Sequence, residues 1–399
     1  NLSKEATEED SLKSVMTSLS GKSDEGVREH LSKLAVKAAK SLTHQVDGRI
    51  DADATLVKKI HDMGRPSVES ELISGLVLAK DRLHSEMKMY PKGGSILILD
   101  GGISRRKPDI DINLKVTDTG MIAALNAQEL RDIQNRVDAI ATTGCNLLCV
   151  RDGIDDDARG MLLKAGITCY RRIEKPDLEL LARTTGSTIV HEPMLARSED
   201  LGKFTSLTSE KWGGVTYMKL VGASSAGLTL VVRGTSKTRM DEVARGFDDA
   251  IGVACGLVRE PRVLPGGGAT QMALARHLRK FAPTVPGREQ LAIEAFAGAL
   301  EAIPRILSEN AGLSPLDELL RLNAAQEVNG PWTGLNIFNG QTAAMDEVGI
   351  IEPLAVSKNA ISGAMEAAVS VLRIDDVLWA NQDPSIPDWE KSDGSAGET

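Results

Sequence analysis

Two adjacent carboxylates, Asp248 and Asp249, precede a run of three glycines at 266–268 by one short stretch of chain. Glycine has no Cβ, so a ligand can lie directly against backbone amides there, and the run opens a helix predicted over 269–280. The N-terminus of a helix favours anions. A nearby carboxylate can orient or deprotonate a water that attacks a γ-phosphate, or hold a metal ion. The pattern indicates a nucleotide site, although a glycine triplet by itself is more often a tight turn.

A second short stretch has residues that suit the same chemistry. The chain reads Thr-Ser-Leu-Ser-Gly-Lys at 17–22, a small polar turn between two predicted helices. Gly21 and Lys22 could reach a phosphate or the ribose of a nucleotide from this turn. The same residue types also suit a helix cap followed by a turn, which is their more common use.

Helices predicted on both sides of the glycines must position these groups. Asp248 and Asp249 fall near the middle of a helix predicted over 238–260, in which apolar residues recur every three or four positions. The further predicted elements are two amphipathic helices within 8–46, strands at 57–60 and 72–78, and helices at 290–307 (broken near Pro304), 314–325 and 358–372.

The central third of the chain has the alternation of an α/β domain. The predicted strands are 95–99, 110–116, 145–150, 167–170 and 188–190, and the helices are 157–165 and 175–185, which end at Gly166 and Gly186. This order favours a sheet with parallel character. A strand pair at 215–221 and 229–234 follows.

One segment of this domain, 117–140, departs from the pattern. Met121, Ile122 and Leu125 lie in a predicted loop or short helix, directly before a polar helix predicted over 127–141. An exposed apolar segment beside a polar helix indicates a contact surface for another chain. An ordinary loop that packs on its own domain is the alternative.

Composition excludes several classes of protein. A chain of 399 residues is too long for one core and predicts two or three domains. The net charge of -9 argues against nucleic acid as the main partner. No apolar stretch approaches the roughly 20 residues that cross a bilayer, so no membrane partner is expected.

The cysteines and the two chain ends add three expectations. Four cysteines without CxxC spacing predict reduced, buried thiols in a cytoplasmic protein. The chain begins at Asn1 and not at Met, already in a helical charge pattern, as a piece of something longer would. The residues 382–399 have few apolar side chains and are predicted to be a disordered tail.

The order of these motifs resembles the group II chaperonins of the thermosome type, over nearly the whole chain. The stretches that carry the resemblance are TSLSGK at 17–22, GIDD at 153–156, AGI at 165–167, PGGGA at 265–269, EQLAIEAFA at 289–297, NAGL at 310–313 and LRIDD at 372–376. The resemblance implies an α+β multidomain fold. Its parts would be a helical equatorial domain, a small intermediate domain in two pieces, and an α/β apical domain with a helical protrusion that serves as a lid.

The resemblance also implies where each domain lies. The intermediate domain would take 1–71 and 222–258, the apical substrate-binding domain 72–221 with its protrusion at 117–140, and the equatorial C-terminal part 259–381. The implied function is an ATP-dependent chaperone that folds unfolded polypeptides inside a double ring of chaperonin subunits, with ATP and Mg²⁺ as cofactors.

Site residues follow from the same resemblance, position by position. Asp249 would activate the hydrolytic water, Gly21 and Lys22 would contact phosphate, and Gly267 and Gly268 would lie against the nucleotide. Asn336, Ile337 and Glu352 would face the adenosine, and Met121, Ile122 and Leu125 would contact clients. No residue is assigned as a metal ligand.

The departures from the family pattern concern the phosphates. The family's phosphate loop, an Asp-Gly-Thr-Thr run with an earlier Gly-Pro turn, has no counterpart in this sequence, so the expected ligands of Mg²⁺ and of the β- and γ-phosphates are missing. Two interpretations follow. Either the N-terminal third of an ATP-driven chaperonin is absent from this chain, or the chain is a shortened relative that binds unfolded polypeptides without hydrolysing ATP.

Overall fold

The computed structural model describes residues 2–22, 24–46, 48–105, 119–212, 214–223 and 227–375. The chain divides into two compact units, Asn1–Pro353 and Leu354–Thr399. In the second unit the described structure is a single helix, α11 (Leu354–Leu372), and a few residues after it. The strand predicted at 110–116 and the tail predicted at 382–399 lie outside the described residues.

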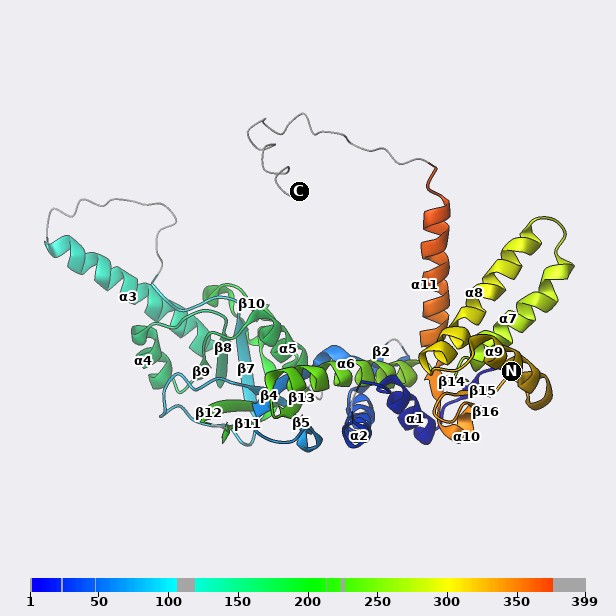
Figure 1. The fold of residues 1–399 in the computed structure, drawn as a ribbon. Helices are drawn as coiled ribbons and strands as arrows, with labels where there is room; N and C mark the ends of the chain where they lie inside the picture. The colour runs from blue at the N-terminus through cyan, green and yellow to red at the C-terminus, as the bar shows by residue number, and fades with distance from the viewer. Residues whose placement is uncertain are drawn as a thin grey trace, which may run out of the picture. The chain divides into compact units, whose positions relative to one another are not determined.

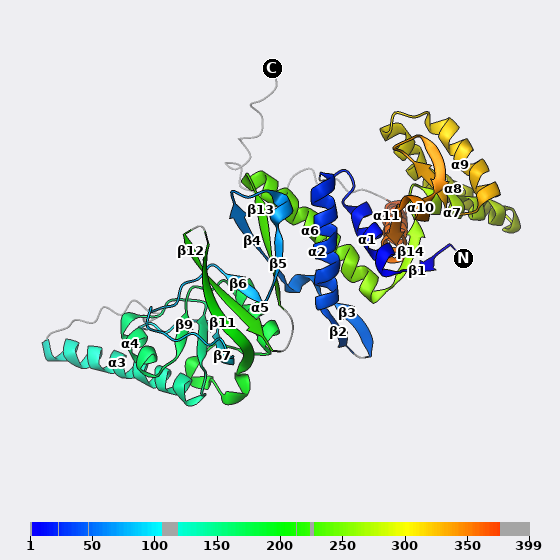
Figure 2. The same cartoon turned by 90° about the horizontal axis from the view of Figure 1, so that it is seen from below.

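Three helices form the first core of the larger unit. They are α1 (Glu8–Ser18), α2 (Glu25–Ser41) and α6 (Lys237–Arg259), and Figure 2 shows them lying against one another. Val15 and Leu31 meet Phe247 and Ile251 of α6 in one buried cluster. A hairpin of β2 (Thr43–Val46) and β3 (Arg49–Ala52) packs against α6. A second sheet places β13 (Leu228–Gly234) between β4 (Val57–Met63), which runs parallel to it, and β5 (Glu71–Ser74), which runs antiparallel.

A seven-stranded mixed sheet forms the second core. Its path is β6 (Leu76–Leu78), β12 (Val215–Gly222), β11 (Gly202–Trp212), β7 (Gly94–Leu99), β8 (Leu147–Val150) and β9 (Thr168–Tyr170), and β10 (Ile189–Val190) also pairs with β7. The strands β7, β8, β9 and β10 are parallel, as predicted.

Both faces of this sheet are covered, which explains its unbroken apolar strands. Leu97 and Leu99 of β7 belong to the core cluster under α3 (Thr119–Thr142) and α4 (Asp156–Lys164). Ile96 and Ile98 point to the other face and pack with α5 (Lys175–Thr185), β11 and β12.

The helix α3 corrects one prediction. The loop or short helix expected before residue 127 is absent, because α3 runs without a break from Thr119 to Thr142. No Pro or Gly falls between 121 and 142, and most residues there are good helix formers. Ile133, Val137 and Ile140 bury its C-terminal half, while its N-terminal half extends past α4 and the sheet (Figure 1). The side chains of Met121, Ile122 and Leu125 lie outside the description.

The strands β12 and β13 correct a second prediction, since they are not paired with each other. β12 pairs with β11 and β6, and β13 pairs with β4 and β5 in a different sheet. The eleven-residue strand β11 was not predicted from the sequence. Its C-terminal half carries polar, largely exposed residues, which hide the strand signal.

The chain after α6 is mostly helical. β14 (Arg262–Pro265) pairs with β17 (Ile351–Pro353) and β1 (Lys4–Glu5). The helices α7 (Ala269–Phe281), α8 (Glu289–Asn310) and α9 (Pro315–Asn329) follow, then the hairpin β15 (Thr333–Asn336) and β16 (Gln341–Ala344), and the short α10 (Met345–Val348). The predicted break near Pro304 is wrong: α8 continues through Pro304, which is buried, and the Ser308 hydroxyl donates to its carbonyl at 2.9 Å.

All four cysteines are free and buried, as predicted. Cys145, Cys149 and Cys169 lie in the clusters on the two faces of the seven-stranded sheet, and Cys255 lies in the cluster of α1, α2 and α6. Burial raises the pKa of the Cys145 thiol to about 11 and that of Cys255 to about 11. These thiols are therefore protonated and unreactive in the folded chain.

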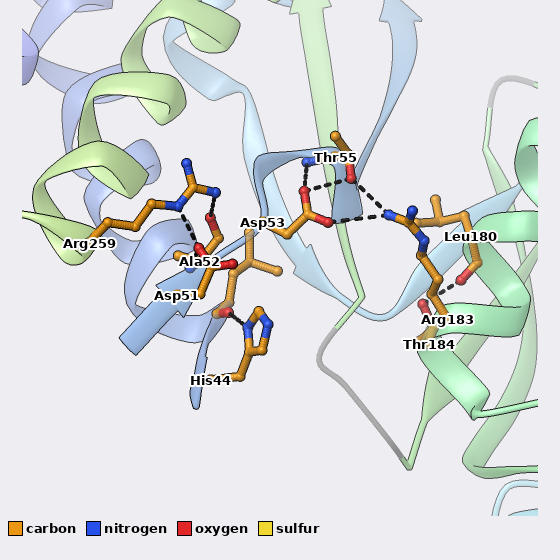
Figure 3. A network of polar contacts seen from close by, with 10 residues as sticks. His44, Asp51, Ala52, Asp53, Thr55, Leu180, Arg183, Thr184 and Arg259 are labelled. Atoms are coloured by element: carbon orange, nitrogen blue, oxygen red, sulfur yellow. Dashed lines mark hydrogen bonds and ion pairs between the residues drawn. The ribbon is translucent and has the colours of Figure 1, made fainter. Parts of the chain in front are cut away.

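A polar junction ties the two cores together (Figure 3). Arg259, the last residue of α6, pairs with Asp51 and donates to the Ala52 carbonyl at 2.7 Å. Asp53, two residues after Asp51, accepts from the Thr55 amide at 2.9 Å and from Arg183 of α5 at 3.2 Å. The end of β3 and the residue after it thus hold the end of α6 on one side and α5 on the other.

Candidate nucleotide site

The helix α6 holds the two predicted acids at the surface. Its start is fixed by Ser236, whose side chain accepts from the Arg239 amide. Its apolar stripe is buried, so the next positions, Asp248 and Asp249, remain about half exposed. Each acid has its own lysine partner.

The lysine partners come from distant parts of the chain. The Lys22 ammonium lies 2.7 Å from Asp249 Oδ2, and Lys59 of β4 pairs with Asp248. Gly21, at φ +76°, allows the tight turn after α1 that brings Lys22 to α6. The predicted grouping of Gly21, Lys22 and Asp249 is therefore present in the structure.

The glycine triplet has a packing role that the sequence did not reveal. Gly267 and Gly268 have φ of +59° and +73°. A Cβ on Gly267 would lie 2.6 Å from the Leu335 carbonyl oxygen and 2.7 Å from the Met345 sulfur, and one on Gly268 would lie 2.6 Å from Cβ of Pro304. The absence of side chains at these positions is thus required by the chain's own packing, independently of any ligand.

A cavity of about 410 Å³ opens between the turn after α1 and the glycines. Thr17, Ser20 and Gly267 contribute polar groups to its wall. The rest of the wall is mainly apolar and consists of Met16, Leu307, Leu335, Ile337, Phe338, Val348 and Ile350, with Arg28 and Gly349. An apolar slot with a few polar groups at one end is the usual form of a small-molecule site.

Arg28 is the cation of this wall. Its Nε is buried and has no hydrogen-bond partner among the described residues, and its Nη2 lies 3.8 Å from the exposed Glu25. A guanidinium with unused donors can bind an oxyanion or a hydroxyl group of a ligand. Nothing in the sequence around position 28 distinguishes this arginine from other helical surface arginines, so sequence reasoning missed it.

The predicted residues of the nucleotide site differ in their position relative to this cavity. Gly267 and Ile337 line the cavity, and Gly268 caps α7 directly behind Gly267. Asn336 and Glu352 do not line the described wall of the cavity. The Asn336 side chain accepts a hydrogen bond from the Phe338 amide at 3.1 Å. Glu352 lies on β17 opposite Leu264. The other apolar wall residues were missed, because isolated apolar side chains carry no signal beyond ordinary core packing.

The residues present fit one end of ATP better than the other. The apolar slot suits a purine, and Thr17, Ser20 and Arg28 offer groups for a ribose or phosphate. The described residues contain no cluster of three or more His, Cys, Asp or Glu side chains that could hold a metal by themselves, whereas Mg²⁺ bound with a nucleotide takes one or two carboxylates together with phosphate oxygens and water. No catalytic step through Mg²⁺ is derived for this chain.

Comparison with known proteins places the fold in a family. A model of the TCP-1/cpn60 chaperonin family matches residues 1–382, and this chain belongs to that family. The thermosome subunit of Methanocaldococcus jannaschii is 39% identical over 387 residues, which cover 96% of this chain and 71% of the relative. The thermosome subunit of Pyrococcus horikoshii is 36% identical and is covered to the same 71%.

A solved structure supports the same assignment. An open-state monomer of a group II chaperonin from Methanococcoides burtonii superimposes with a TM-score of 0.74 at 31% identity, covering 94% of this chain and 88% of the other. The group II chaperonin fold and the α+β class predicted from the motifs are therefore confirmed. None of the described helices combines the length and apolarity needed to span a bilayer.

Proposed function

We propose that this chain is a thermosome-type chaperonin subunit that works in a ring, binds unfolded polypeptides and couples their folding to ATP. Family membership supports the chaperone role, since its curated relatives are named thermosome subunits. The cavity lined by Thr17, Ser20 and Gly267 supports the nucleotide role, because it is formed by segments more than 200 residues apart in the sequence. Lys22 and Asp249 do not line it, but Lys22 follows Ser20 by two residues in the turn after α1.

The domain boundaries belong to this proposal. The cluster of α1, α2 and α6 draws its buried members only from 15–56 and 228–255, which supports an intermediate domain in two pieces, 1–71 and 222–258. The clusters around the seven-stranded sheet fall within 76–220, which supports an apical domain at 72–221. Because β5 pairs with β13, the junction is better drawn after Ser74. The residues 259–381 would be the equatorial part.

Within the site, each residue has a proposed role. The adenosine would enter the apolar slot beside Ile337, with Asn336 and Glu352 near its rim, and the phosphates would extend along Gly267 and Gly268 toward Lys22. ATP supplies the phosphoryl group whose transfer to water drives the cycle. Lys22 would move from Asp249 to the phosphate, and Asp249 would then be free to accept a proton from water.

Binding of ADP to the chain tests this proposal. We expect weak binding, in the range of about millimolar, because the slot holds the adenosine while no Asp-Gly-Thr-Thr loop holds the phosphates. Saturation-transfer NMR should show contact at the adenine and ribose protons. Ile337→Asp should abolish it, and Val328→Asp, at an 84% exposed position of α9, should not. Micromolar affinity that requires Mg²⁺, or equal signals in both variants, would contradict this arrangement.

A second candidate is a chaperonin relative that binds polypeptides without hydrolysing ATP. Residues 1–399 contain no Asp-Gly-Thr-Thr run to hold the phosphates, so these residues by themselves are expected to turn over ATP weakly or not at all. Purified chain, alone and mixed with a thermosome, would be assayed for ATP turnover and for suppression of client aggregation. Suppression by the chain alone, with no turnover of its own and none in the mixture beyond that of the thermosome, would favour this second candidate.

A further inference from the structure

The carboxyl ends of the parallel strands form a second cavity, remote in sequence from the nucleotide site. Its volume is about 790 Å³, within the usual range for small-molecule pockets. It opens where β7 ends, with β8 paired on one side of that strand and β10 on the other. The connections on the two sides cover opposite faces of the sheet, so this is the switch point at which open α/β sheets bind ligands.

Backbone hydrogen bonds fix the floor of this cavity. After β7, the Asp100 amide donates to the Val190 carbonyl at 2.8 Å, and the Gly101 carbonyl accepts from the Asp152 amide at 3.0 Å. A Cβ on Gly102 would lie 2.7 Å from the Gly153 carbonyl oxygen, so only glycine permits this close crossing. These contacts fix the positions of residues 100–102 at the floor of the cavity.

A buried arginine lines the cavity without an acidic partner. Arg136 of α3 is only 8% exposed. Its guanidinium donates to the Ser104 carbonyl at 2.9 Å and forms no ion pair with a carboxylate of the described residues. A buried guanidinium is costly unless its charge is compensated, and four of its five N–H groups have no protein acceptor in that part of the chain.

Three carboxylates line the same cavity, Glu129, Asp155 and Glu192, and a different arginine contacts two of them. Arg105, exposed at the rim, lies 3.5 Å from Glu129 and 3.1 Å from Asp157, and its amide donates to Asp155 at 2.8 Å. Arg136 itself forms no salt bridge with these carboxylates among the described residues, so its guanidinium keeps donors for a ligand. The carboxylates Glu129, Asp155 and Glu192 at the wall disfavour a multiply charged ligand.

We propose that this cavity is a binding site for a small molecule that presents one singly charged oxyanion, in the first place a carboxylate, to Arg136. The planar guanidinium matches a carboxylate with two parallel hydrogen bonds. Hydroxyl or amine groups of the same ligand would face Glu129 and Asp155. This site shares no residue with the nucleotide cavity and does not depend on the function proposed for it.

Titration of the full chain with sodium acetate tests the site. The guanidinium Nε–H resonances of arginine-labelled protein would be followed at constant ionic strength, with sodium chloride and inorganic phosphate as the other titrants. The Arg136 resonance should shift saturably with acetate, more weakly with phosphate, and not with chloride. Tighter binding of phosphate would overturn the assignment to a monoanion, and equal, linear shifts with all three salts would overturn the site.

Two matched pairs of variants locate the binding. Acetate affinity, measured by calorimetry, should fall at least about tenfold in Arg136→Gln, the loss expected for one charge-assisted contact. It should be unchanged in Arg131→Gln, an exposed arginine of the same helix. Ser104→Glu places a carboxylate beside Arg136 and should remove binding without removing the arginine, whereas Gln128→Glu, exposed on α3, should not. Unchanged affinity in Ser104→Glu would overturn the proposal even if Arg136→Gln failed to fold.

Discussion

Lys22 and Asp249 are 227 residues apart in the chain, yet their side chains form a hydrogen-bonded ion pair of 2.7 Å. The pair joins the turn after α1 to the middle of α6. Both side chains are about half exposed, so the contact itself contributes no more than about 1 kcal/mol to stability. Its importance is chemical: the cation expected at the phosphates and the acid expected at the water neutralise each other when no nucleotide is bound.

Removal of Asp249 should therefore affect turnover and not folding. In an assembled, ATP-hydrolysing ring containing this subunit, we expect Asp249→Ala to lower its turnover by roughly 10²–10⁴-fold, the usual effect of losing a positioned base. Nucleotide binding should persist, because Lys22 is released. Steady-state phosphate release and equilibrium nucleotide binding are the measurements.

The neighbouring acid provides the control for this experiment. Asp248 pairs with Lys59, on the side of α6 facing β4. Asp248→Ala should leave turnover within about twofold of the parent. If Asp248→Ala were the damaging change and Asp249→Ala were silent, the assignment of the base would be wrong.

The glycine triplet should be intolerant of alanine for reasons of packing. Gly268→Ala forces a residue at φ +73° to hold a Cβ 2.6 Å from Cβ of Pro304, and we expect a loss of about 1–3 kcal/mol in the free energy of unfolding. Gly252→Ala, in α6, meets no atom within 4 Å and should stabilise the chain by about 0.5–1 kcal/mol. Urea unfolding measures the free energy of unfolding of both variants. If Gly268→Ala and Gly252→Ala changed it equally, Pro304 would move aside without cost.

The same glycines show how far the sequence could lead. The types Gly, Lys and Asp at 21, 22, 249 and 267 carried a chemical signal, and the structure brings their segments together. Arg28, Leu335 and Phe338 could not be identified, because an arginine or an apolar residue next to a cavity is indistinguishable in sequence from one in an ordinary helix or core. Pro304 misled the helix prediction, since α8 continues through it although a proline removes one backbone donor from the helix.

Acid should weaken the start of α1 through Asp10. Burial by itself raises the pKa of Asp10, but hydrogen bonds from Thr7 and the ammonium of Lys4 outweigh it and hold this pKa below the ordinary 3.8. A depressed folded-state pKa contributes stability that is present above the unfolded value and is lost as pH falls through the folded one. Asp10→Asn should therefore cost about 1 kcal/mol at neutral pH and less at an acidic pH below the ordinary 3.8.

Urea unfolding at the two pH values measures this difference. Glu9→Gln is the matched control, because the Glu9 side chain is 74% exposed and should have little effect at either pH. A destabilisation by Asp10→Asn that persists undiminished in acid would show that the side chain acts through its shape and not through its charge.

The projecting half of α3 should act as the client-binding segment of the apical domain. We expect a fragment of about 75–222, which contains the whole seven-stranded sheet, to fold independently and suppress aggregation of an unfolded protein. Amides at 119–130 should exchange faster than those of β7 and β8. Replacing Met121, Ile122 and Leu125 with Ser should weaken suppression without lowering Tm by more than a few degrees.

A buried position of the same helix separates surface from core effects in this fragment. Ile133→Ser, at a side chain only 1% exposed, should lower Tm strongly. If the triple variant melted as low as Ile133→Ser, the three apolar residues would belong to the core and their role in client binding would fail.

The buried cysteines fall into two groups, one in each core, so that their reaction with a thiol reagent reports separately on each core. A thiol reagent can reach Cys145, Cys149 or Cys169 only when the seven-stranded sheet opens, and Cys255 only when α6 separates from α1 and α2. Under brief labelling, the modified fraction of each group therefore records how often its core opens. A comparison of the modified fraction of Cys255 with that of the three sheet cysteines would reveal whether the two cores open together or one at a time. No engineered probe is needed.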